Sequence, residues 1–86
     1  MTIHKRDLQA VFSRLCDDFK TAGVDTSGWI LSTWSPGDGC TRYRVESNTL
    51  PDQPLGGWQW LGAKEAYYGM QTACAAVELV LRARAA

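Results

Sequence analysis

The chain has 86 residues, enough for one small domain over residues 1–86 but not for a second hydrophobic core. Hydrophobic residues make up 45% of the chain and charged residues 21%, a globular balance that excludes a disordered polar tail. Nine Lys and Arg balance nine Asp and Glu, and this zero net charge argues against duplex nucleic acid as the main partner.

The sequence shows neither a membrane-spanning segment nor a secretion signal. No apolar run approaches the roughly 18 residues that a membrane-spanning helix needs. The first six residues lead into an amphipathic stretch and not into the apolar segment of a signal peptide. We therefore expect a soluble cytoplasmic protein that has no membrane partner.

Cysteine and histidine usage argues against metal and thiol chemistry. Cys16, Cys40 and Cys74 lie far apart in the sequence, and His4 is the single histidine. A structural zinc site needs four such ligands, usually in close pairs, and a disulfide framework is typical of secreted chains. We predict three thiols that pack as small hydrophobic side chains, with no metal site and no cofactor.

The first element is predicted to be a helix that ends near Gly23, a natural stop signal. Adjacent Asp17 and Asp18 point about 100° apart on such a helix, which is poor geometry for paired acid–base work. We expect both to be solvated surface charges. The apolar stripe, spaced i, i+3, i+4, i+7, comprises Leu8, Val11, Phe12, Leu15, Cys16 and Phe19.

Residues 28–34 and 41–45 are rich in β-branched and aromatic side chains and are predicted to form a hairpin. The Pro and Gly residues between them set turn dihedrals. With a four-residue loop from Pro36 to Gly39, Ser35 faces Cys40, whereas a one-residue bulge would exchange the faces of one strand. The four-residue loop places Ile30, Trp34, Tyr43 and Val45 on one face, and Trp29, Leu31, Arg42, Arg44 and Glu46 on the other.

The second half of the chain is predicted to hold a loop over residues 47–57, a short strand at 58–61 and a helix from Ala63 to about Arg84. Both helices are expected to pack on one face of a three-stranded antiparallel sheet. The predicted fold is therefore a two-layer α+β domain of order α-β-β-β-α.

The last helix has more apolar surface than one small sheet can cover, because residues 70–81 contain only three polar side chains. We expect its sheet-facing side to comprise Ala66, Met70, Ala73, Val77 and Val80. The remaining flank, unless the first helix covers it, is predicted to pair two copies as a homodimer. This oligomer interface would contain Ala75, Ala76 and Leu79.

Two segments resemble known proteins. Residues 60–67 (WLGAKEAY) and 23–29 (GVDTSGW) are similar to small uncharacterised accessory proteins of mycobacteriophages and other actinobacteriophages. The resemblance implies a phage gene product that acts inside an actinobacterial cell. It implies no catalytic residues, because that family has no assigned chemistry.

The element order also resembles that of a double-stranded RNA-binding domain. That family grips phosphates through a lysine cluster that opens its last helix, whereas the matching positions here hold only Lys64, followed by Glu65. The resemblance therefore implies a shared topology without the RNA-binding mode.

Four tryptophans, at positions 29, 34, 58 and 60, are the unusual feature of this chain. They are either core residues, or part of a protein interface, or a platform on which single-stranded bases stack. If Trp58 and Trp60 join the arginine face of the hairpin, an aromatic surface with stacked guanidinium groups results. The candidate binding residues are then Trp29, Arg42, Arg44, Trp58 and Trp60.

No residue set in the sequence supplies nucleophile, base and orienting group together, and Glu65 and Glu78 lack evident partners. We therefore expect no enzyme and no catalytic residues. The favoured interpretation is a phage-type accessory protein that binds an unidentified host or phage protein. The alternatives are a nucleic-acid-binding domain that uses the aromatic face, and a structural homo-oligomer.

Overall fold

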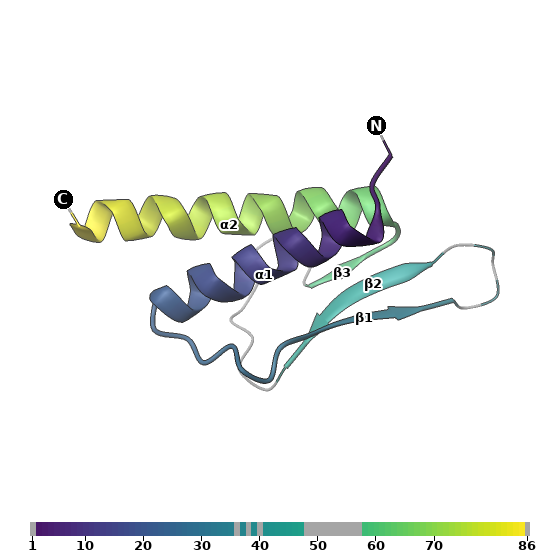
Figure 1. Cartoon of the computed structure of the whole chain (residues 1–86), viewed down its shortest axis with the longest axis horizontal. Helices are drawn as coiled ribbons and strands as arrows, with labels where there is room; N and C mark the ends of the chain where they lie inside the picture. The colour runs from purple at the N-terminus through teal and green to yellow at the C-terminus, as the bar shows by residue number, and fades with distance from the viewer. Residues whose placement is uncertain (1, 36, 38, 40, 48–57, 86) are drawn as a thin grey trace.

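The computed structural model describes residues 2–35, 37, 39, 41–47 and 58–85. Its elements confirm the predicted order α-β-β-β-α (Figure 1). They are α1 (Lys5–Thr21), β1 (Ile30–Trp34), β2 (Arg42–Glu46), β3 (Gln59–Trp60) and α2 (Ala63–Ala85).

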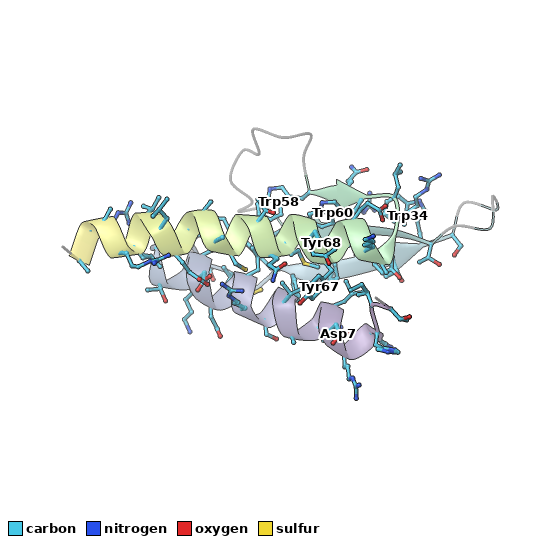
Figure 2. The ribbon with its side chains drawn as sticks, turned by 90° about the horizontal axis from the view of Figure 1, so that it is seen from above. Asp7, Trp34, Trp58, Trp60, Tyr67 and Tyr68 are labelled. Atoms are coloured by element: carbon cyan, nitrogen blue, oxygen red, sulfur yellow. The ribbon has the colours of Figure 1, made fainter. Side chains whose placement is uncertain are left out.

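The helices and the sheet form two layers. The sheet is antiparallel with strand order β1-β2-β3. Both helices run in the same direction and lie on one side of it, as the two views in Figures 1 and 2 show. No described element covers the opposite side of the sheet, which we call the open face. Neither described helix combines the length and apolar character that crossing a membrane requires.

Helix α1 begins and ends where local chemistry dictates. The backbone N–H of His4 donates to Oδ2 of Asp7 at 2.8 Å, which satisfies one of the groups that a helix start leaves unpaired. The predicted stop is confirmed, because Ala22 caps the helix and Gly23 follows with a φ of 100°. The stripe faces α2 and the sheet through its buried residues Leu8, Val11 and Leu15.

The hairpin register differs from the predicted one by one residue. Trp34 pairs with Arg42, so seven residues separate the paired ends, and not the six that the four-residue loop requires. Side chains alternate along a strand, so this step moves one strand's residues to the opposite faces. Val45 now lies opposite Leu31 on the helix side, where it is buried, while Ile30 joins the arginines on the open face.

One cluster of apolar side chains holds the two layers together. Leu15 of α1 and Met70 and Cys74 of α2 are fully buried where the helices meet. Three aromatic rings close the other end, with ring centroids 5.2 Å apart for Phe19 and Trp29, 5.8 Å for Phe19 and Trp58, and 5.9 Å for Trp29 and Trp58. These are edge or tilted contacts, the arrangement that aromatic quadrupoles favour.

Helix α2 is buried along a narrower stripe than the sequence suggested. Its buried residues are Ala66, Met70 and Cys74. Val80, expected to face the sheet, is 48% exposed, and the prediction for it is wrong. The reason is geometric: the last turns of α2 project past the end of α1 and past the sheet, where no described part of the chain covers them (Figure 1).

Candidate functional site

The structure separates the five predicted binding residues into two groups. Trp29 and Trp58 are 6% and 7% exposed and belong to the core, and Trp60 is half-buried beside them. The condition that Trp58 and Trp60 join the arginine face is therefore not met, and the alternative that they are core residues applies to both. Arg42 and Arg44 do lie on the open face, on the side of the sheet away from the helices.

Strand pairing explains why Trp58 and Trp60 face the helices. The N–H of Val45 donates to the carbonyl of Trp58 at 3.0 Å, and Tyr43 pairs with Trp60. Residues paired across an antiparallel ladder point to the same face. Because Val45 is buried under the helices, Trp58 and Trp60 lie on that side too.

A glycine in α2 makes room for the Trp60 indole. A Cβ placed on Gly69 would lie 2.7 Å from Cε2 of Trp60, closer than real Cβ contacts. Glycine is a poor helix former, so its presence inside α2 is the sequence signal that a large group packs against this turn. Read with the tryptophans, Gly69 could have indicated that Trp60 packs on the helix.

The open face carries a different aromatic–arginine pair. The guanidinium carbon of Arg44 lies 5.0 Å from the centroid of the Trp34 ring, a cation–π contact. Nη2 of Arg44 also pairs with Oε1 of Glu46 at 2.6 Å, and the Ser32 hydroxyl donates to the other oxygen of that carboxylate. These bonds hold the guanidinium in place over the indole ring.

Exposed apolar surface adjoins this pair. Ile30 is 59% exposed and Trp34 38% exposed on the same face as the two arginines. We call these four residues the open-face patch: Ile30, Trp34, Arg42 and Arg44. Nε of Arg44 is shielded from water and has no hydrogen-bond partner among the described residues.

The α1–α2 seam holds a second polar cluster. Arg14 donates to both carboxylate oxygens of Glu78, at 2.7 and 2.6 Å, and this hydrogen bonding lowers the pKa of Glu78 to about 2. Burial, followed by the neighbouring carboxylate of Glu78, raises the pKa of Asp18 to about 6. Two expectations are therefore wrong: Asp18 is not a solvated charge, and Glu78 has a partner across the fold.

The thiols of the described part of the chain are shielded. Cys74 is fully buried, its Sγ lies 4.0 Å from the carbonyl of Val11, and burial raises the pKa of its thiol to about 11. Burial also raises the pKa of Cys16, which is half-buried. Both fit the predicted role of small hydrophobic residues, whereas Cys40 lies outside the described residues.

A hollow of about 210 Å³ also lies between the helices, near the labelled Asp7 and Tyr67 in Figure 2. Two of its polar side chains are already engaged, because Asp7 caps α1 and Arg14 binds Glu78. A ligand that used either side chain would have to displace these contacts, so the hollow is a weaker candidate than the open-face patch. It is lined by Asp7, Ala10, Val11, Arg14, Tyr67 and Gln71.

The predicted oligomer interface lies on the exposed side of α2. Ala75, Ala76 and Leu79 are all exposed, and Leu79 retains 63% of its accessible surface. Helix α1 therefore leaves this flank uncovered. The pairing of two copies through it stays a prediction.

Comparisons with protein-family models, with curated proteins and with solved structures found no match.

Proposed function

We propose that this chain is a non-catalytic binding module of the phage accessory type, and that its open-face patch contacts a host or phage protein. The observation that carries the proposal is the exposed Trp34 with Arg44 stacked on its ring, beside the exposed Ile30. Tryptophan and arginine are the residue types most enriched where binding energy concentrates in protein interfaces.

The fold supplies a rigid base for such a contact. Trp34 and Arg44 project from neighbouring strands, and the core on the other side of the sheet fixes those strands. Arg44 is also held in place by Glu46, so binding would order few additional side chains. A partner carboxylate or carbonyl near Arg42 and Arg44 would complement the arginine excess of this face.

Nucleic acid is the weaker candidate for the same patch. Stacking of a base needs a free aromatic face, and the guanidinium of Arg44 already covers one face of Trp34. The zero net charge of the chain also gives little attraction to a phosphate backbone. A protein surface fits the mixed apolar and charged patch better.

The test is quantitative affinity capture from an actinobacterial lysate, with and without phage infection, followed by mass spectrometry. Wild type is compared with Trp34→Ser, which alters the patch, and with Leu79→Ser, which alters a more exposed apolar residue on α2. We expect at least one protein to be retained by wild type and Leu79→Ser and lost from Trp34→Ser. Circular dichroism checks that both variants are folded.

Two outcomes would contradict the proposal. One is that every captured protein is retained equally by Trp34→Ser. The other is that capture depends on nucleic acid, so that nuclease removes it and retention falls steeply between about 50 and 200 mM salt.

A further inference from the structure

Strand β1 forms one edge of the sheet. It pairs with β2 on one side, and no described segment pairs with its other side. Its five residues, Ile-Leu-Ser-Thr-Trp, include no charge and no proline. Natural sheets usually protect such edges with charged side chains, prolines or bulges, because unpaired backbone groups recruit another strand. Within its own five residues, β1 has none of these.

The direction of the backbone groups follows from the neighbouring strand. The N–H of Val45 points toward β3, where it donates to the carbonyl of Trp58. The N–H and C=O groups of successive residues alternate in direction along a strand, so the groups of Arg44 point toward β1, where Arg44 pairs with Ser32. On β1, the groups of Ser32 therefore point toward β2, and the groups of its two neighbours point away from β2. The free edge presents the N–H and C=O groups of Leu31 and Thr33.

This edge is complementary to a second copy of itself. A residue whose backbone groups point away from β2 must lie opposite such a residue of the second copy. The possible antiparallel registers between the two β1 strands are therefore shifted from one another by two residues. Placing Leu31 opposite Thr33 of the second copy, and the reverse, forms four N–H···O=C bonds and keeps all five residues paired. Ser32 then lies on the twofold axis, and Ile30 lies opposite Trp34 of the second copy.

Side chains on both faces of the sheet accept this register. On the open face, the exposed Ile30 and Trp34 become cross-strand neighbours, a favourable β-branched–aromatic pair. On the helix side, Thr33 is exposed, which shows that the helices do not cover that end of β1. The nearest arginines are on β2, one strand inward, so their backbone positions in the two copies are about 14 Å apart.

We propose that the outer edge of β1 binds the same edge of a second copy of this chain, giving a dimer with one continuous six-stranded sheet. The arrangement is isologous, the commonest type of homodimer contact. It joins the two open-face patches into one surface. The inference does not depend on the proposed function, because it concerns the strand edge and not the face.

The test compares Thr33→Pro with Thr33→Val. Both remove the hydroxyl, but only proline removes the outward N–H, and neither removes a hydrogen bond between β1 and β2. Sedimentation velocity over a wide concentration range should show dimers of wild type and Thr33→Val. Thr33→Pro loses two of the four bonds, and we expect its dissociation constant to rise about tenfold or more.

Hydrogen exchange on wild type gives a readout that needs no substitution. The amides of Leu31 and Thr33 should gain protection as concentration rises, while the amide of Ser32, bonded to β2, is protected throughout. The proposal is overturned if wild type stays monomeric, if Thr33→Pro dimerises like Thr33→Val, or if dimerisation leaves the amides of Leu31 and Thr33 unprotected. Should Thr33→Pro fail to fold, the exchange pattern decides alone.

Discussion

Gly69 is the position where one methyl group tests how Trp60 packs on α2. In the change Gly69→Ala, the new Cβ would meet the rigid indole of Trp60, with Cε2 only 2.7 Å away. Alanine is better than glycine in a helix interior by about 1 kcal/mol, so an unobstructed site would gain that much. Overpacking costs about 1–3 kcal/mol, because the indole must move away from the core. We therefore expect Gly69→Ala to be destabilised by up to about 2 kcal/mol.

The assay is urea and thermal unfolding followed by circular dichroism. A loss of 1 kcal/mol lowers the melting temperature by about 4–8 °C in a domain of this size. The double variant Trp60→Leu/Gly69→Ala tests the cause, because alanine should be harmless or stabilising once the indole is absent. If Gly69→Ala gains about 1 kcal/mol in the wild-type background, Trp60 does not pack on this turn and our placement of it is wrong.

Two further predictions concern the helices. Because the pKa of Asp18 is raised from its ordinary 3.8 to about 6, its ionisation costs stability as pH rises through that range. Asp18→Asn should therefore gain more stability over wild type at pH 8 than near pH 4.5 in urea unfolding; an equal difference at both would refute this. Leu79→Glu should change stability by no more than about 0.5 kcal/mol, because Leu79 is 63% exposed. Light scattering of Leu79→Glu also separates the two possible dimer interfaces: the variant should be monomeric if copies pair through α2, and dimeric if they pair through the edge of β1. Strong destabilisation of the variant would mean that Leu79 is not exposed.

The order and type of the elements could be predicted because each has a local signal. The stripe of α1 has helical spacing, and Gly23 marks its end. Strands β1 and β2 are rich in β-branched and aromatic residues, and a turn rich in glycine separates them. Because each signal depends on a few neighbouring residues, the helices and strands could be predicted without knowledge of how they pack together.

The hairpin register could not be predicted in the same way, because it depends on which face of the hairpin the helices bury. Ile30 and Leu31 are equally suited to burial by composition. What decides between them is that Leu31 pairs with Val45, and that Val45 is buried under the helices. A turn longer by one residue is a small local difference, yet it transfers Ile30 to the open face. The register brought Ile30 into the candidate site, whereas the pairing of β3 with β2 removed Trp58 and Trp60 from it.

The small size of the domain explains which tryptophan remains for function. A two-layer fold of 86 residues has one core, between a single sheet face and two helices, and large aromatic rings fill much of it. Trp29 and Trp58 are buried in that core, and Trp60 lies against Gly69 at its edge. Trp34 is left on the open face, where no contact with the core holds it and the stacked Arg44 orients it. A change at Trp34 should thus affect binding with little effect on folding, whereas changes at Trp29 or Trp58 would affect both.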